Sequence, residues 1–378
     1  MYLLHQKLRL VLLYFYRMRL LSTLFILTFL SPSFGQEYPT PESYLCYKST
    51  KPINVDGIID EKDWEKAEWT DLFVDIEGDK KPLPKYNTRA KMLWDDEYLY
   101  ISAELHEPNL WSTITERDAV IYHDNDFEVF INPNPSSQMY YEFEMNLLNT
   151  VWDLIMTKPY RDGGSYMNSW HIDGLKSAVK MYGTLNEPSD VDEKWTLEIA
   201  FPWKVIGQEK PTLIYPKEGR RWRINFSRVN WDLDVENGKY VKHIDPNTGK
   251  PAAEYNWVWS AQGEIAMHMP EQWGYIQFTE NKVGDKKKID VSETEGERLH
   301  RQLFDIYRLQ KKYWYEHRVY AKTFDELGWK TIMKYNSEEL QPELNQVAGG
   351  FEVVLKVPQE DKIYVVRHDS SSDVISIK

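Results

Sequence analysis

Two stretches of the chain, 121–133 and 139–147, alternate between apolar and polar residues and constrain the fold more than any other feature. A period of two is typical of a β-strand with one buried face. The segment between them, 132–138, is rich in Pro, Asn and Ser, and each Pro fixes φ and lacks a ladder donor. The pattern predicts a hairpin with one face on a core. The apolar side consists of Phe127, Val129, Ile131, Tyr141, Phe143 and Met145.

The opposite face of this hairpin is acidic. Its acids are Asp126, Glu128, Glu142 and Glu144. Like charges that face each other across strands destabilise a sheet, so a compensating partner is expected. That partner is a basic side chain from a neighbouring strand, a bound cation, or a polar ligand, and a solvated outer face is the alternative. Arg223 and Arg228 of the alternating stretch 221–230 are the candidate basic partners.

Composition limits the class of protein. Hydrophobic residues make up 42% of the 378 residues, which is enough for a packed core. The 15 Trp and 25 Tyr suit sugar stacking, although most are expected to fill the core. The net charge of −13 repels phosphate backbones and argues against a nucleic-acid partner.

Residues 1–35 are predicted to be a signal peptide, and Met18 is an alternative start. Arg17 and Arg19 precede a short apolar run that ends in small residues before Gln36. The run is too short for a transmembrane helix, so no stable membrane insertion is expected. We therefore predict a secreted or periplasmic protein, with a signal anchor as the alternative. The single Cys46 allows no internal disulfide.

The spacing of the strand patterns predicts the domain organisation of the chain. Residues 36–280 contain about ten short strands and almost no long amphipathic helix, which predicts an all-β antiparallel β-sandwich. A charged linker is expected at 281–294. Apolar residues then recur at helical spacing from about 295 to 317, and three short strands follow. Residues 295–378 are therefore predicted to form a small C-terminal α+β appendage.

Five motifs, in order, resemble the carbohydrate-binding modules of family 9. They are VDGIIDEKDW at 55–64, AKMLWDDEYLYI at 90–101, NDFEVFI at 125–131, WTLEIAFPW at 195–203 and WGYIQF at 273–278. The resemblance implies a sandwich of the family 9 and DOMON-like type that binds sugars, often at a glycan chain end. It also implies calcium as a structural ion.

The resemblance also assigns site residues. The sugar-binding acid of the family falls on Glu128 and its Asn falls on Asn146, while Glu144 replaces an Arg and inverts the charge. Tyr122 takes the place of one stacking Trp. The second Trp aligns near Met267 and His268.

The aromatic clamp is therefore incomplete, and other Trp residues are candidate replacements. These are Trp111, Trp170, Trp257 and Trp259. Core or loop packing is the alternative role for each of them.

A cation site is a further expectation for the acidic hairpin. Asp124, Asp126 and Glu128, with Asp118 nearby, offer hard oxygen ligands suited to Ca²⁺. The spacing does not match an EF-hand, and the scattered His residues disfavour a zinc site. No organic cofactor is expected.

The sequence thus predicts a secreted, non-catalytic protein of polysaccharide utilisation that binds an oligosaccharide or polysaccharide. Tyr122 would stack on the sugar, and Glu128, Glu144 and Asn146 would bind hydroxyls. One alternative is a hydrolase or lyase that uses Glu128 and Glu144 as paired acids. Another is a structural envelope protein without a ligand.

Overall fold

The computed structural model describes residues 38–206, 215–285 and 287–377. The predicted signal peptide of residues 1–35, including Met18, lies outside the described residues. Within the described part, no helix is both long enough and apolar enough to cross a membrane.

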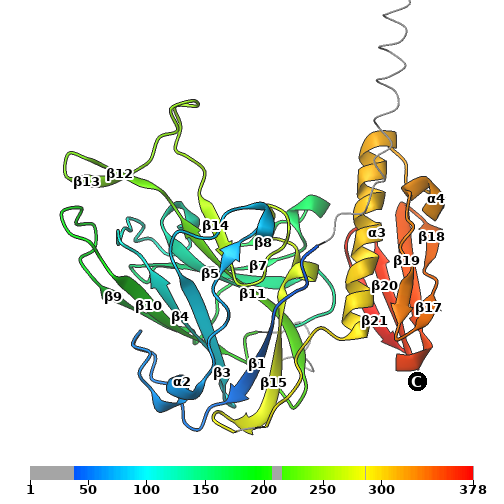
Figure 1. The fold of residues 1–378 in the computed structure, drawn as a ribbon, viewed down its shortest axis with the longest axis horizontal. Helices are drawn as coiled ribbons and strands as arrows, with labels where there is room; N and C mark the ends of the chain where they lie inside the picture. Colours follow the sequence, from blue (N-terminus) through cyan, green and yellow to red (C-terminus); the bar gives the residue numbers. More distant parts are fainter. Residues whose placement is uncertain (1–37, 207–214, 286, 378) are drawn as a thin grey trace, which may run out of the picture. The chain divides into compact units, whose positions relative to one another are not determined.

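Thirteen of the described strands form one sheet, in the order β8-β7-β6-β5-β11-β15-β1-β3-β4-β10-β9, with β14 paired to β11 and β2 paired to β14 (Figure 1). These strands are β1 (Ser43–Lys48), β2 (Val74–Asp75), β3 (Thr88–Trp94), β4 (Tyr98–His106), β5 (Asp126–Asn132), β6 (Tyr140–Asn146), β7 (Val151–Met156), β8 (Tyr166–Met167), β9 (Lys176–Tyr182), β10 (Lys194–Pro202), β11 (Arg221–Asn230), β14 (Tyr255–Val258) and β15 (Gly274–Lys282). A separate hairpin contains β12 (Leu233–Glu236) and β13 (Lys239–Lys242). The short helices of this part are α2 (Lys62–Lys66), η1 (Gly78–Lys80), η2 (Ile121–His123), η3 (Tyr160–Asp162) and η5 (Pro270–Gln272).

The main core lies between the two halves of this sheet, which confirms the predicted β-sandwich. Phe127 and Phe143 of the predicted hairpin contribute their side chains from one half, and Leu197 and Ile199 of β10 contribute theirs from the other. β5 and β6 pair antiparallel, as their alternation predicted.

One part of the sheet departs from the predicted antiparallel pairing. β1 is parallel to both of its neighbours, β15 and β3. It joins the two halves of the sandwich between strands that are far apart in sequence. Parallel neighbours cannot be linked by a tight turn, and hairpin patterns in the sequence therefore do not reveal this pairing.

The motifs of the sequence build this scaffold. The carboxylate of Glu198, in the fourth motif, accepts hydrogen bonds from the backbone N–H groups of Asp56 and Gly57, each at 2.9 Å. It also accepts one from Trp64 Nε1 at 2.7 Å. Gly57 has φ +84°, and a Cβ there would lie 2.7 Å from the Val179 carbonyl carbon. The first motif is thereby fixed on β10, because only a glycine fits against β9.

We expect Glu198→Ala to destabilise the sandwich by about 2–5 kcal/mol, because it leaves three donors without their acceptor. Thermal unfolding would measure this as a lower Tm. Glu193→Ala is the matched control, since the Glu193 side chain is 66% exposed just before β10. An equal Tm for both variants would contradict the structural role of Glu198.

The C-terminal part begins with α3 (Glu295–His317), at the predicted bounds. Thr294 caps it, since its hydroxyl accepts from the Glu297 N–H and the Glu297 side chain accepts from the Thr294 N–H. The remaining elements are α4 (Phe324–Leu327), β16 (Met333–Tyr335), β17 (Glu338–Leu340), β18 (Glu343–Val347), β19 (Gly350–Val357), η6 (Pro358–Glu360), β20 (Lys362–Arg367) and β21 (Ser372–Ser376).

β18 to β21 form a four-stranded antiparallel sheet, one strand more than predicted. β18 is a half-exposed edge strand and has the mostly polar sequence ELNQV, so it lacks the apolar alternation on which prediction depends. Leu299 and Leu303 of α3 share a core with Val353 and Leu355 of β19, which confirms the α+β appendage.

Candidate functional site

Four carboxyl groups define an acidic face on the side of β5 and β6 that points away from the main core. We use this name for Asp126, Glu128, Glu142 and Glu144. Glu128 lies directly opposite Glu144 in the ladder between the two strands. The exposed fractions are small, at 0% for Asp126, 2% for Glu144 and 6% for both Glu128 and Glu142. The predicted acidic face is therefore largely withdrawn from bulk solvent.

The predicted basic partners lie elsewhere. Arg228 points to the opposite side of β11, where its guanidinium contacts Glu107 at 2.7 Å. Arg223 donates to the backbone oxygens of Glu271 and Trp273. Among the residues that the structure describes, no Lys, Arg or His forms an ion pair with the acidic face, so neither predicted Arg compensates its charge.

Burial without a basic partner changes the proton affinity of these groups. Burial, with a contribution from Glu254, raises the pKa of Glu128 to about 7. Burial and the charge of Glu128 raise the pKa of Glu142 and of Glu144 well above the usual range. The pKa of Asp126 rises for the same two reasons. Near neutral pH the acidic face thus offers both protonated carboxyls, which donate hydrogen bonds, and carboxylates, which accept them.

Two tyrosines lie at the rim of the acidic face. Tyr122 of η2 is 36% exposed, and its backbone N–H donates to Glu144 at 3.0 Å. Tyr160 of η3 is 49% exposed. Burial and the neighbouring Glu144 raise the pKa of the Tyr122 phenol, and burial and Glu142 raise that of Tyr160 to about 12. The charges of the acids therefore act on both phenol groups.

His268 connects this rim to a hollow of about 410 Å³. Its ring centroid lies 4.5 Å from that of Tyr160, and its Nδ1 lies 2.8 Å from the Tyr140 hydroxyl. Burial, together with the charge of Arg161, lowers the pKa of His268 to about 4. The hollow is lined by Tyr160, Arg161, Glu264, Ile265, Ala266, Met267, His268, Met269 and Arg308. Its volume lies within the range of small-molecule sites.

Asn146 and Trp259 do not fit their predicted roles as ligand contacts. Asn146 is 0% exposed, and its amide donates to the Ile114 carbonyl and to Asp124 while its oxygen accepts from Leu148 and Thr150. All its hydrogen-bonding capacity is thus used within the protein. Trp259 is 3% exposed in the main core, so its faces pack against protein.

Trp111 is also packed, with 7% of its surface exposed. Trp231, which was not among the predicted aromatic residues, contacts Tyr122. Its Nε1 donates to the Tyr122 carbonyl at 2.9 Å. The ammonium of Lys242 lies 3.2 Å from the Trp231 ring centroid. Trp231 directly follows the alternating stretch 221–230, and this position at the end of a strand is the signal that could have marked it.

Asp124 does not act as predicted for a metal ligand. Its carboxylate accepts hydrogen bonds from Ser112 Oγ, from the Thr113 hydroxyl and backbone N–H, from Ile114 N–H and from the Asn146 amide. These contacts fix the loop after β4 and leave the carboxylate little capacity for a cation. Asp126 and Glu128, which were also predicted as ligands, lie instead with Glu144, and one ligand oxygen from each of the three lies within 4.8 Å of the others.

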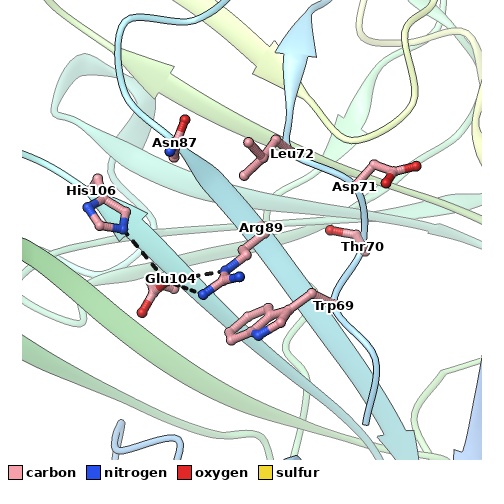
Figure 2. A pocket seen from close by; sticks show the side chains of 8 residues that line it. All are labelled: Trp69, Thr70, Asp71, Leu72, Asn87, Arg89, Glu104 and His106. Atoms are coloured by element: carbon pink, nitrogen blue, oxygen red, sulfur yellow. Dashed lines mark hydrogen bonds and ion pairs between the residues drawn. The ribbon is translucent and has the colours of Figure 1, made fainter.

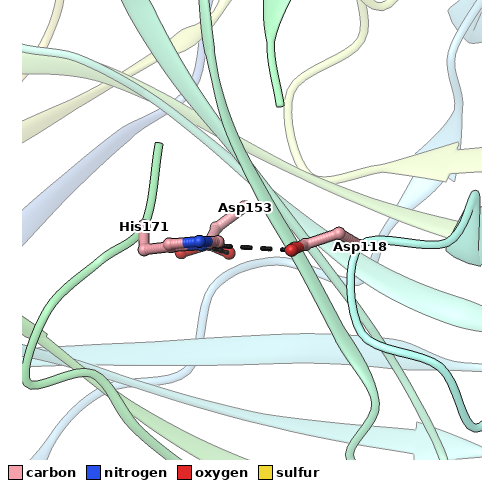
Figure 3. A group of neighbouring side chains, drawn as sticks. All are labelled: Asp118, Asp153 and His171. Carbon is pink, nitrogen blue, oxygen red and sulfur yellow. Dashed lines mark ion pairs between the residues drawn. The ribbon is translucent and has the colours of Figure 1, made fainter. Parts of the chain in front are cut away.

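A second group of possible ligands contains Asp118, Asp153 and His171 (Figure 3). Here the charge is already compensated, because Arg117 forms an ion pair with Asp153 and lies 3.7 Å from Asp118. The acidic face differs from this group in having no such basic neighbour.

The other half of the sheet carries a second hollow, of about 370 Å³ (Figure 2). Arg89 donates to Glu104, which also pairs with Lys194 at 2.7 Å. The Arg89 guanidinium lies 4.2 Å from the centroid of the Trp69 ring. The charge of Glu104 in this hollow is thus compensated by Arg89 and Lys194.

The fold and the site together define a β-sandwich module with an aromatic rim beside a hollow. Residues 55–280 match the family described as carbohydrate family 9 binding domain-like, which is more than half of the chain. The chain belongs to this family. Membership supports carbohydrate binding.

Two curated relatives share part of the sequence. Exoglucanase XynX of Acetivibrio thermocellus is 27% identical over 165 residues, which are 42% of this chain and 12% of that protein. Endo-1,4-beta-xylanase A of Thermoanaerobacterium saccharolyticum is 27% identical over 124 residues, which are 33% of this chain and 9% of that protein. The chain therefore matches only a small part of each.

Among solved structures, a family 9 module of Caldicellulosiruptor kristjanssonii in complex with cellotriose is 14% identical, with a TM-score of 0.40. The match covers 66% of this chain and all of that one. Similarity at this level does not transfer its ligand to this chain.

The raised pKa values predict that the acidic face lowers the free energy of unfolding as pH rises. A carboxyl whose folded pKa is raised contributes stability that is complete below its unfolded pKa and is lost as pH rises through the folded pKa. For Glu128 this window runs from the usual 4.5 to about 7. Glu144→Gln keeps an acceptor for the Tyr122 N–H and removes the charge.

We therefore compare the Tm of Glu144→Gln with that of the natural protein, both in EDTA. We expect the two Tm values to be nearly equal at pH 5, and the Tm of the variant to be clearly higher at pH 8. One pKa unit corresponds to about 1.4 kcal/mol, and each kcal/mol to roughly 2–4 °C. Glu236→Gln, which removes an exposed acid of β12, should show no such trend. A Tm difference independent of pH would contradict the interpretation.

Proposed function

We propose that this protein is a secreted, non-catalytic carbohydrate-binding protein that holds an oligosaccharide or a glycan chain end beside the acidic face. Family membership supports the ligand class. The N-terminal pattern of residues 1–35 supports export, and the partial matches to an exoglucanase and a xylanase favour a role in polysaccharide utilisation.

The observation that carries the proposal is the convergence of two exposed tyrosines on buried carboxyls next to a hollow. The flat rings of Tyr122 and Tyr160 provide apolar surface for the C–H face of a pyranose. Glu144 accepts from the Tyr122 backbone N–H at 3.0 Å and faces Glu128 in the ladder, so both acids are near this residue and can exchange hydrogen bonds with hydroxyl groups. Hydroxyls both donate and accept, which matches a set of carboxyls in mixed protonation states.

The spacing of the acids argues against one form of the hydrolase alternative. Glu128 and Glu144 have ligand oxygens within 4.8 Å of each other. The carboxyl groups of inverting glycosidases are about 6.5–9.5 Å apart, because a water lies between them, whereas those of retaining enzymes are about 5–5.5 Å apart. The pair is therefore too close for an inverting enzyme, and incubation with a bound glycan tests for a retaining one.

We expect Tyr122→Ala to weaken oligosaccharide binding at least about tenfold, the effect of losing roughly 1.4 kcal/mol of stacking. A glycan array would identify the ligand, and isothermal titration with cello- and xylo-oligosaccharides would measure its affinity. Tyr315→Ala is the matched control, since Tyr315 is 61% exposed on α3 and outside the site.

Prolonged incubation of each bound glycan distinguishes the alternatives. Unchanged glycan supports a binding protein, whereas released product would support the hydrolase or lyase. No binding to any glycan would contradict the proposal and favour a structural envelope protein.

A further inference from the structure

The arrangement of three acids on the acidic face matches the size of a calcium ion. Asp126, Glu128 and Glu144 each place one ligand oxygen within 4.8 Å of the other two. Ca²⁺ lies roughly 2.3–2.6 Å from its oxygen ligands, so oxygens on opposite sides of one ion are about 4.6–5.2 Å apart. One ion can therefore contact all three carboxylates with little movement of the strands.

An unsatisfied oxygen inside the group points to a missing partner. Asp126 is 0% exposed, and its Oδ1 accepts one hydrogen bond, from the Val229 N–H at 3.2 Å. Its Oδ2 is buried and has no hydrogen-bond partner among the described residues. A buried carboxylate oxygen without a donor is costly, and a cation at this position would remove the cost.

Neighbouring groups leave the position open to a cation. The second acidic group of the sandwich, which contains Asp153, already has Arg117 as its counter-ion. No equivalent Arg or Lys contacts Asp126, Glu128 or Glu144 in the described chain. The Tyr122 backbone N–H donates to Glu144 at 3.0 Å, and the Tyr122 residue is 36% exposed, so the group borders solvent at this residue.

We propose that Asp126, Glu128 and Glu144 bind a calcium ion, and that this ion contacts two neighbouring hydroxyls of the saccharide beside Tyr122. The bridging role rests on the proposed function. Ca²⁺ takes six to eight oxygen ligands, more than three carboxylates used one oxygen at a time can supply. Two vicinal sugar hydroxyls are suitable oxygens for two of the remaining positions, and water or a second oxygen of a carboxylate can complete the shell. The ion would also offset the negative charge that β5 and β6 concentrate at one point.

Calcium titration of the full chain after EDTA treatment tests the site without a sugar. We expect saturable Ca²⁺ binding by isothermal titration, weakened at least tenfold by Glu144→Gln and by Asp126→Asn. Glu144→Gln keeps the acceptor for Tyr122, and an unchanged circular dichroism spectrum would show that the variant folds.

Two controls locate the ion. Asp118→Asn alters the group of Figure 3, and this variant should retain the Ca²⁺ binding that Glu144→Gln weakens. Glu236→Gln, with the same charge change on exposed β12, should bind Ca²⁺ as the natural protein does. Calcium binding that is lost in Asp118→Asn and retained in Glu144→Gln would overturn the proposed site, as would a lack of any calcium binding.

Saccharide titrations in Ca²⁺, in Mg²⁺ and in EDTA test the bridge. We expect at least tenfold tighter sugar binding in Ca²⁺ than in EDTA, and a loss of this difference in Glu144→Gln. Equal sugar affinity in Ca²⁺ and EDTA would overturn the bridge and leave the proposed function standing. Normal Ca²⁺ binding without affinity for any glycan would overturn both the bridge and the proposed function, while the ion site would stand.

Discussion

Burial removes the water that stabilises a charged carboxylate, and a second carboxylate nearby adds electrostatic repulsion. β5 and β6 impose both costs at once, because their alternation places one set of side chains in the core and turns Glu128 and Glu144 toward each other. The strand register leaves these acids no alternative position. Whatever occupies or covers this surface must therefore supply protons, positive charge or hydrogen-bond donors.

Hydrogen bonds position the segment that carries Tyr122. Asp124 fixes the loop that leads to η2. Trp231 then holds the backbone of Tyr122. These contacts are structural, yet together they determine where the exposed ring of Tyr122 lies relative to the acids.

The sequence is most informative where one periodic pattern determines burial. The alternation of Phe127 and Val129 with Glu128 is sufficient to predict the strand, its buried face and its acidic face. It did not define the partners of those side chains. Arg228 has the right charge, but it lies on the opposite side of β11 with Glu107.

Site residues that depend on loops were the hardest to predict. Asn146 matched a family pattern, but its amide nitrogen donates to the loop at Ile114 and its oxygen accepts from Thr150 in a local turn. Tyr160 belongs to a short helical turn with no periodicity, and only the fold brings it beside Glu142. The polar edge strand β18 was missed for a related reason, since its burial is too slight to leave a pattern.

The position of β1 has a consequence for how the chain becomes folded. β1, near the start of the sandwich, lies between β3 and β15, and β15 is its last strand. During synthesis one edge of β1 therefore stays unpaired until residues 274–282, which form β15, have left the ribosome. Such long-range pairing slows folding, so the unpaired edge of β1 is open to incorrect pairing until the final strand is available.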